Sequence, residues 1–285
     1  MILSLTEEDI SMLDPTIAKE ILSRFQVKDR PSILDAVNLG KSSELELETW
    51  GLFCACLAWG GLVAKRKLLI RFYRSLRGSF TEFVKEPSLE MLKSIYKTKV
   101  GALKLHSLCL AIGDLLEEHK SVGKFVSKSK NVKQAIFRLA YTLRERMDKL
   151  PLERRFNLPK VTLNLPTTMQ EKRRIGALKR YCMYFRWMIR NSEPDFGIWS
   201  FFDKRDLWHP LDTHVAKIMK RWGVLENDLP NWLNVEKVTE YFRLVDPEDP
   251  LKFDYHLVTF GQKFCRKNDP LCWKCKVRSL FNCNL

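Results

Sequence analysis

The chain has 285 residues, of which 45% are hydrophobic, so it is long and apolar enough to bury a core, and this excludes a disordered protein. Lysine and arginine outnumber aspartate and glutamate by 49 to 34, which gives a formal net charge of +15. A surface of this charge favours polyanions, and nucleic acid is the first partner to consider, with a plainly solvated basic surface as the alternative.

The N-terminal segment does not look like an export signal, because Glu7, Glu8 and Asp9 stand where a secretory peptide needs a basic start and an apolar run. The longest uncharged stretch, residues 49–64, contains three glycines and is shorter than the roughly 20 residues that span a bilayer. We expect it to be a buried helix. These features predict a cytoplasmic, nucleoid-associated monomer with no membrane partner.

Helical spacing of apolar residues dominates the first half of the chain, most clearly at residues 17–25, 68–76 and 136–143. Strand-like alternation is scarce, so we predict an all-α fold. Residues 151–166 hold three prolines and no helical stripe. We interpret them as a loop between the helical first half and a basic helix at Lys179.

The predicted helix at residues 178–190 has two distinct faces. Its apolar stripe consists of Leu178, Tyr181, Cys182, Phe185, Met188 and Ile189. Lys179, Arg186 and Arg190 fall on another side. A row of three cations beside a buried stripe suits a DNA-facing helix, and a salt-bridged surface helix is the alternative.

The segment His-Pro-Leu-Asp-Thr-His-Val at residues 209–215 places Asp212 just before a predicted helix. Asp212 is therefore well placed as an N-cap, and the helix dipole would hold its carboxylate ionised. Such a carboxylate can stabilise positive charge at a sugar C1′ or activate a nucleophile. His214 and Lys217 share another face of the helix, where they would contact phosphates or be solvated.

Four cysteines gather at the C-terminal end: Cys265, Cys272, Cys275 and Cys283. In a reducing compartment such a cluster indicates metal binding rather than disulfides. Its spacing suits either a structural zinc or a [4Fe–4S] cluster and does not choose between them. We expect the other four cysteines to be small buried hydrophobic residues: Cys54, Cys56, Cys109 and Cys182.

Two of these motifs carry a resemblance to the helix-hairpin-helix DNA glycosylase superfamily. The cysteine spacing is similar to the cluster loop of endonuclease III and its adenine-glycosylase relatives, although the gap from Cys275 to Cys283 is longer. Residues 209–215 resemble the Pro-x-Asp-Thr-His-Val segment with the superfamily's catalytic aspartate. The resemblance implies a [4Fe–4S] cluster on the four cysteines, with zinc as the alternative, and a catalytic Asp212.

The resemblance also implies a nucleophile. In bifunctional members a lysine that opens the second helix of the hairpin attacks C1′ and forms a Schiff base, after which the strand is cut by β-elimination. Lys179 occupies the matching place. The family's Leu-Pro-Gly-Val-Gly hairpin is absent, and the gap from Lys179 to Asp212 is longer than in endonuclease III. In this longer gap the chain is similar to the archaeal 8-oxoguanine glycosylases.

Further residues are assigned by the same resemblance. The predicted base pocket, in which a flipped base would be read by stacking and edge hydrogen bonds, consists of Trp187, Asp195, Trp199 and Trp208, with aromatic core as the alternative for any one tryptophan. The predicted DNA contacts are Arg180, Arg186, Arg190, His214, Lys217, Arg266 and Lys267. From Leu45 to Cys283 the chain most resembles an uncharacterised bacterial branch of the superfamily.

The predicted architecture is two helical lobes, a middle lobe of residues 45–200 and a second lobe of residues 1–44 and 201–285, with DNA in the cleft between them. The predicted function is a DNA base-excision glycosylase with AP lyase activity, acting on double-stranded DNA that carries a damaged base. Two alternatives stay open. One is a monofunctional glycosylase in which Asp212 activates water, and the other is a non-enzymatic nucleic-acid-binding protein that kept the fold.

Overall fold

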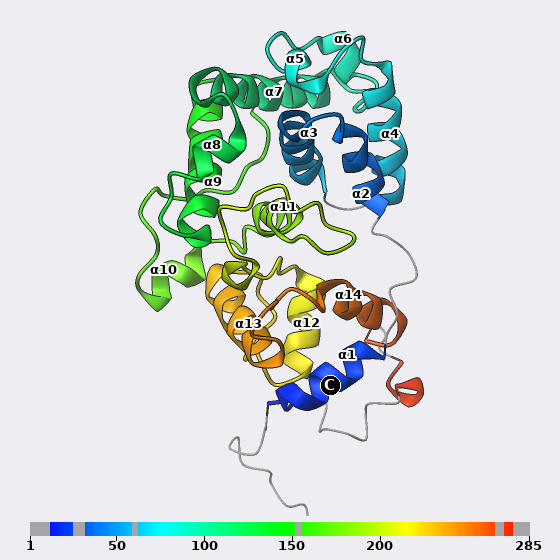
Figure 1. Ribbon diagram of the computed structural model, residues 1–285, viewed down its shortest axis with the longest axis vertical. Coiled ribbons are helices and arrows are strands. Elements are labelled where there is room, and N and C mark those ends of the chain that lie inside the picture. Colours follow the sequence, from blue (N-terminus) through cyan, green and yellow to red (C-terminus); the bar gives the residue numbers. More distant parts are fainter. Residues whose placement is uncertain (1–11, 25–31, 59–61, 152–154, 266–270, 276–285) are drawn as a thin grey trace, which may run out of the picture. The chain divides into compact units, whose positions relative to one another are not determined.

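The computed structural model describes residues 12–24, 32–58, 62–151, 155–265 and 271–275 (Figure 1). Across these ranges the chain forms helices and short 3-10 turns, with one isolated β-bridge between Gly176 and Asn231 and no strand. The predicted all-α fold is confirmed. No helix within these ranges is long and apolar enough to cross a membrane.

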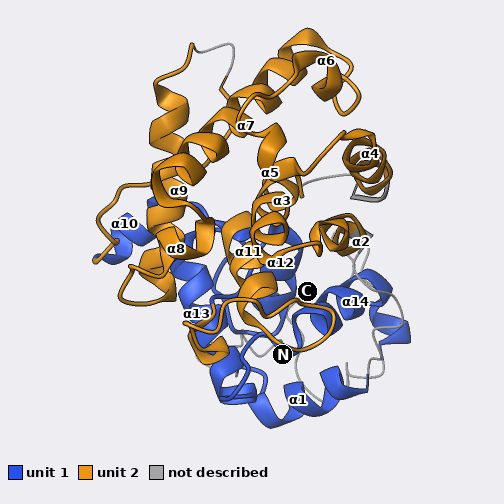
Figure 2. Cartoon of the chain, turned by 45° about the horizontal axis from the view of Figure 1, so that its top comes forward, with its two compact units in different colours: residues 1–28, 168–179, 208–285 blue, residues 29–167, 180–207 orange. Residues whose placement is uncertain are grey.

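The chain divides into two compact units, coloured separately in Figure 2. Unit 1 comprises residues 1–28, 168–179 and 208–285, and unit 2 comprises residues 29–167 and 180–207. Residues 29–44 and 201–207, which the predicted second lobe contained, belong to unit 2, and residues 168–179, which the predicted middle lobe contained and which include Lys179, belong to unit 1. Lys179 and Asp212 therefore belong to the same unit.

Unit 2 is built from short and long helices that surround α3 (Glu44–Leu57). The others are α2 (Ser32–Val37), η1 (Asn38–Gly40), α4 (Leu62–Ser75), α5 (Phe80–Phe83), α6 (Leu89–Leu92), α7 (Lys99–His119), α8 (Val122–Val126), α9 (Val132–Asp148), α11 (Lys179–Ile189) and η3 (Lys204–Asp206). The helices predicted at residues 68–76 and 136–143 are α4 and α9, so both are confirmed. Residues 155–168 contain no helix, as the prolines predicted for this segment.

Helix α3 forms the centre of unit 2, since every residue from Glu46 to Leu57 is buried. Ser43 begins it as N-cap, with its hydroxyl accepting a hydrogen bond from the Glu46 N–H at 3.1 Å. Trp50, which is completely buried, packs its ring against Phe80 at 4.9 Å. The stretch at residues 49–64 is not one helix as expected, since α3 ends at Leu57 and α4 begins at Leu62.

Helix α11 has the predicted apolar stripe, but its other faces are also covered. Tyr184 and Trp187 are at most 1% exposed, although neither belongs to the stripe. The helix is therefore enclosed on several sides, and its arginines Arg186 and Arg190 are buried with it.

Unit 1 is a smaller helical assembly. It contains α1 (Pro15–Ser23), α10 (Met169–Arg174), α12 (Thr213–Arg221), α13 (Trp232–Val245), α14 (Asp254–Lys263) and η4 (Cys272–Lys274). Its core includes Trp222 and Phe260, whose rings meet edge to face at 5.6 Å. The Tyr241 hydroxyl donates to the Leu13 carbonyl at 3.0 Å and so attaches the segment before α1 to α13. The helix predicted at residues 17–25 is α1, which ends at Ser23.

Candidate active site

The segment before Lys179 is fixed against the start of α13. The Ala177 N–H donates to the Pro230 carbonyl at 2.9 Å, and the Trp232 N–H donates to the Ile175 carbonyl at the same distance. Leu178 then takes a left-handed backbone conformation, with φ of 49°, which a leucine rarely adopts. Its side chain is 4% exposed, so burial holds this turn in place. Lys179 follows as the first residue of α11.

Asp212 is the N-cap of α12, as its sequence setting predicted. One carboxylate oxygen, Oδ1, accepts hydrogen bonds from the His214 and Val215 N–H groups, both at 2.9 Å. The segment leading to it is anchored by His209, which is fully buried and whose N–H donates to the Thr239 hydroxyl at 3.0 Å. The segment therefore runs from a fully buried residue, His209, to the half-buried carboxylate of Asp212 at the start of α12.

Lys179 and Asp212 form an ion pair. The Lys179 Nζ lies 2.7 Å from Asp212 Oδ2, the oxygen that the helix cap does not use. Their side chains are 34% and 33% exposed, so the pair is shielded on one side and open to solvent on the other. A partner molecule can reach both groups.

Opposing effects act on the pKa of Asp212. Partial burial raises it, but the Lys179 ammonium and the two N–H groups of α12 outweigh burial, so the pKa lies below its ordinary value of 3.8. Asp212 is therefore a carboxylate at neutral pH. It can stabilise a developing cation or accept a proton from Lys179, and the lysine can supply an amine nucleophile.

The structure places two predicted DNA contacts away from solvent. Arg186 and Arg190 are 1% and 6% exposed, and both contact the same Asp195 oxygen at 3.1 Å. The expected surface row with Lys179 is therefore not formed. The turn after α11 brings Asp195 back against the helix, and the two guanidinium groups compensate this buried carboxylate instead of facing outward.

The remaining predicted DNA contacts differ in setting. Arg180 is half-buried in unit 2, where it donates to the Cys56 carbonyl at 2.8 Å and the Asn157 carbonyl at 3.1 Å. His214 and Lys217 are half-buried on α12. Arg266 and Lys267 lie outside the described residues.

The predicted base-pocket residues differ in burial and belong to both units. Trp187 and Trp199 are 1% and 3% exposed in the core of unit 2, where the Trp199 Nε1–H donates to Glu48 Oε2 at 3.0 Å. Asp195 is occupied by the two arginines. Trp208 belongs to unit 1, half-buried, with its ring 5.5 Å from that of Trp232. The aromatic-core alternative describes Trp187 and Trp199.

Three of the four C-terminal cysteines lie in the described residues. Cys265 follows α14, and its sulfur lies 3.2 Å from the Arg221 Nη1. Burial raises the pKa of the Cys265 thiol, the Arg221 guanidinium opposes the rise, and Cys272 and Cys275 add to it, so the three thiols lie within electrostatic range of one another. Cys283 lies outside the described residues.

The cysteine chemistry fits a metal centre, since four thiols can supply all the ligands of a zinc ion or a [4Fe–4S] cluster. Among the described residues alone, however, no three cysteine, histidine or acidic side chains are grouped closely enough to hold a metal ion. By contrast, Cys54, Cys56, Cys109 and Cys182 are all fully buried, as expected for core residues.

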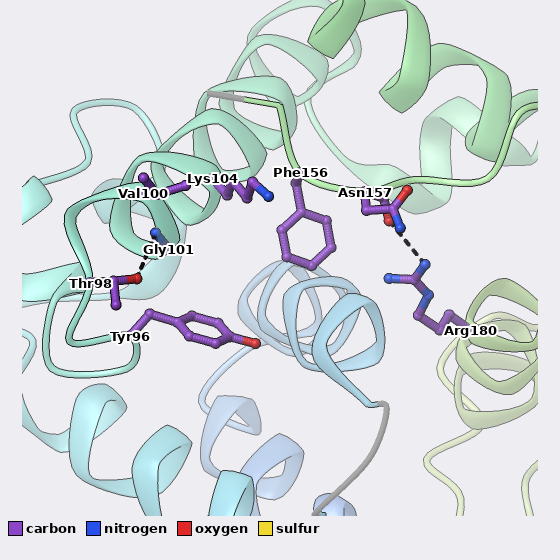
Figure 3. Close-up of a pocket in the computed structure, with 8 residues that line it drawn as sticks. All are labelled: Tyr96, Thr98, Val100, Gly101, Lys104, Phe156, Asn157 and Arg180. Atoms are coloured by element: carbon purple, nitrogen blue, oxygen red, sulfur yellow. Dashed lines mark hydrogen bonds between the residues drawn. The ribbon is translucent and has the colours of Figure 1, made fainter. Parts of the chain in front are cut away.

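One feature that the sequence analysis missed is a cavity in unit 2, whose lining includes Tyr96, Lys104, Phe156 and Arg180 (Figure 3). Its residues come from segments far apart in the chain, so no local motif marks it. The sequence held one weak signal of this region. Thr98 is a residue of the type that caps helices, it stands directly before an apolar helical pattern, and Lys104 follows in the first turns of that helix.

The fold and the site together define an all-helical protein with a lysine–aspartate pair at the starts of two helices. Residues 38–263 match the model of the DUF2400 family, described as proteins of unknown function, and the chain belongs to this family. A 70-residue segment is 33% identical to endonuclease III of Sulfolobus acidocaldarius. That match covers 24% of this chain and 30% of the archaeal protein. No solved structure matches the chain.

Proposed function

We propose that the protein is a DNA base-excision glycosylase with AP lyase activity, in which Lys179 is the nucleophile and Asp212 its electrostatic and acid–base partner. The observation that carries the proposal is the 2.7 Å contact between Lys179 Nζ and Asp212 Oδ2. Similarity of one segment to a protein named endonuclease III and the net charge of +15 support DNA as the substrate.

The ion pair explains how the lysine would be activated. In the pair its nitrogen carries a third proton and has no free electron pair, so one proton must leave before attack. The Asp212 carboxylate already contacts that ammonium and is the nearest acceptor. A substrate that displaces water from this half-open site weakens the preference for two separated charges and favours transfer to the neutral amine and acid.

The reaction then balances as follows. The Lys179 nitrogen bonds to C1′ of a flipped nucleotide, and the C1′–base bond breaks with its electron pair going to the base, which takes a proton. Opening of the sugar ring at C1′–O4′ gives the protonated Schiff base. Loss of a C2′ proton then expels the 3′ phosphate, and the strand is cut. Asp212 returns its proton to the departing base, passes a proton from the Lys179 nitrogen to O4′ as the ring opens, and as a carboxylate between these transfers stabilises the positive charge at C1′.

A monofunctional glycosylase is the second candidate, and the contact between Lys179 and Asp212 is also compatible with it. In this candidate Lys179 stays an ammonium ion beside Asp212 and binds phosphate as a cation, while the carboxylate activates water. This reaction releases the base without a covalent enzyme–DNA species.

We propose that Cys265, Cys272, Cys275 and Cys283 hold a [4Fe–4S] cluster with a structural role, and zinc is the alternative. Iron–sulfur ligation would add a rigid covalent link to a basic segment that includes Lys274. Anaerobically purified protein should be brown, with absorbance at about 400 nm and iron and sulfide in equal amounts. Colourless protein that contains stoichiometric zinc would favour the alternative.

The function is tested by borohydride trapping on a panel of duplexes that each carry one damaged base or an abasic site. The wild-type protein should become covalently attached to at least one duplex, and Lys179→Gln should not. Lys220→Gln is the matched control, because Lys220 is an exposed lysine of the neighbouring helix α12. Base release without trapping would favour the monofunctional enzyme, and no reaction on any duplex would favour a DNA-binding protein without this chemistry.

A further inference from the structure

Unit 2 contains a cavity of about 500 Å³ that the proposed reaction at Lys179 and Asp212 does not use. This volume falls within the usual range of small-molecule sites, about 300 to 1,000 Å³. The lining comes from the start of α7, from the loop after α9 and from α11. All these residues belong to unit 2, so the cavity is defined within one compact unit.

Two aromatic rings project into the cavity, as Figure 3 shows. Tyr96 precedes α7 and is half-buried, and Phe156 lies in the loop after α9 and is 7% exposed. The Arg180 guanidinium lies 5.9 Å from the centre of the Phe156 ring. Flat apolar faces at the edge of an open cavity provide stacking surfaces for another planar group.

The same cavity is positively charged. Its lining includes Lys104 and Arg180 but no acidic residue. Arg180 donates to the main-chain carbonyls of Cys56 and Asn157, and neither of these contacts compensates its charge. Burial and the nearby Arg180 lower the pKa of Lys65, so a further basic group lies close by.

The N-terminus of helix α7 adds to the positive electrostatic potential of the cavity. Thr98 caps it and lines the cavity together with Gly101, whose N–H donates to the Thr98 hydroxyl at 3.1 Å. The helix is 21 residues long and has no acidic residue in its first turn, so the positive end of its dipole is not offset there. Lys104 stands one turn further along, beside Gly101 on the same face.

We propose that this cavity binds a nucleotide, with the base against the rings of Tyr96 and Phe156 and the phosphate held by Lys104, Arg180 and the N-terminus of α7. The ligand is either a free nucleoside phosphate or one nucleotide of a nucleic-acid strand, since the two share this chemistry. The cavity goes beyond the proposed function, because nothing in it requires Lys179 or a damaged base.

The test is direct binding, measured by titration calorimetry on the full-length protein with three probes: adenosine 5′-monophosphate, thymidine 5′-monophosphate and a single-stranded oligonucleotide without damage. Lys104→Gln removes one phosphate contact and Tyr96→Leu removes one ring. Both side chains are only half-buried, so folding should survive, and thermal denaturation checks this. Lys124→Gln is the control, an equal loss of charge at an exposed position on α8.

We expect at least one probe to bind the wild-type protein, and each cavity variant to weaken binding about tenfold while Lys124→Gln does not. Binding of a mononucleotide identifies a free ligand, and binding of the oligonucleotide alone identifies a strand. The proposal is overturned if no probe binds, or if the control weakens binding as much as the cavity variants. Because the assay involves no damaged base and no covalent step, its failure leaves the trapping result unaffected, and the converse also holds.

Discussion

At the scale of single residues, Asp212 combines a structural and a chemical role by dividing its two oxygens. Oδ1 accepts two main-chain hydrogen bonds that begin α12, and Oδ2 contacts the Lys179 ammonium. The sequence predicted the cap, because a proline before the aspartate and an apolar face after it mark a helix start, whereas Lys179 was chosen by the family resemblance. It did not predict the left-handed turn at Leu178, since leucine rarely adopts that conformation.

The division predicts that Asp212→Asn separates stability from activity. Asparagine keeps an oxygen for the cap but places an amide where the ammonium needs an acceptor. The free energy of unfolding should fall by less than about 1 kcal/mol, because caps of the two types are equivalent and a half-exposed ion pair contributes little. Trapping should be lost.

Asp212→Ala is the matched comparison for this variant, since it removes the cap as well. It should be about 1 kcal/mol less stable than Asp212→Asn in chemical denaturation. If Asp212→Asn retains full trapping activity, the carboxylate has no part in the reaction.

The lowered pKa of Asp212 also predicts how stability depends on pH. A carboxyl whose pKa is lower in the folded state stabilises the fold when ionised, and this contribution is lost as pH falls through the lowered pKa. The stability difference between wild type and Asp212→Asn should therefore stay constant from pH 7 to about pH 5 and shrink below 3.8. Denaturation across this range measures it, and a difference that grows on acidification would contradict the ion pair.

At the scale of elements, the contact between α12 and α14 depends on a glycine. A Cβ at Gly261 would lie 2.4 Å from His214 Nε2 and 2.5 Å from Ile218 Cδ1. The close approach positions α12, and with it Asp212. The sequence predicted α12 but not α14, and it could not predict how closely the two helices approach, because nothing local distinguishes this glycine from others.

Gly261→Ala should therefore displace the ends of the His214 and Ile218 side chains and lower the free energy of unfolding by about 1 kcal/mol. Gly78→Ala serves as control, because nothing lies within 4 Å of a Cβ at that position, and it should change stability by less than about 0.5 kcal/mol. Equal effects of the two changes in thermal denaturation would show that the contact carries no energy.

Helix α11 shows where a helical pattern misleads. Lys179, Arg186 and Arg190 share a side of the helix, but only Lys179 belongs to the half-open pair with Asp212. The carboxylate that compensates the two arginines comes from Asp195, in the turn beyond the helix, and periodicity within the helix contains no information about it.

Asp195→Asn should consequently destabilise the protein by about 3 kcal/mol, because two buried guanidinium groups lose their shared carboxylate. Asp148→Asn is the comparison, since it removes a carboxylate from a surface pair with Arg144 and should cost less than about 1 kcal/mol. Chemical denaturation of both variants decides. A small effect of Asp195→Asn would mean that the buried cluster is not needed for the fold.

At the scale of the whole molecule, helical spacing predicted the all-α fold and the helices α1, α4, α9, α11 and α12, whereas α7 and α13 were not predicted. The division into units was harder to predict from the sequence, because residues 168–179 belong to a unit most of which lies C-terminal to them. The unit 2 cavity had no local signal, since Tyr96, Lys104, Phe156 and Arg180 are brought together only by packing. Motifs identified the chemical pair because its two members each begin a helix.

The proposed covalent bond between Lys179 and DNA can be located by mass spectrometry of the borohydride-trapped complex. After digestion of protein and DNA, the account predicts a peptide that contains Lys179 and carries the reduced deoxyribose remnant on its side-chain nitrogen. The same remnant on another lysine or on the N-terminal amine, or base release by the wild-type protein with no adduct at all, would contradict it.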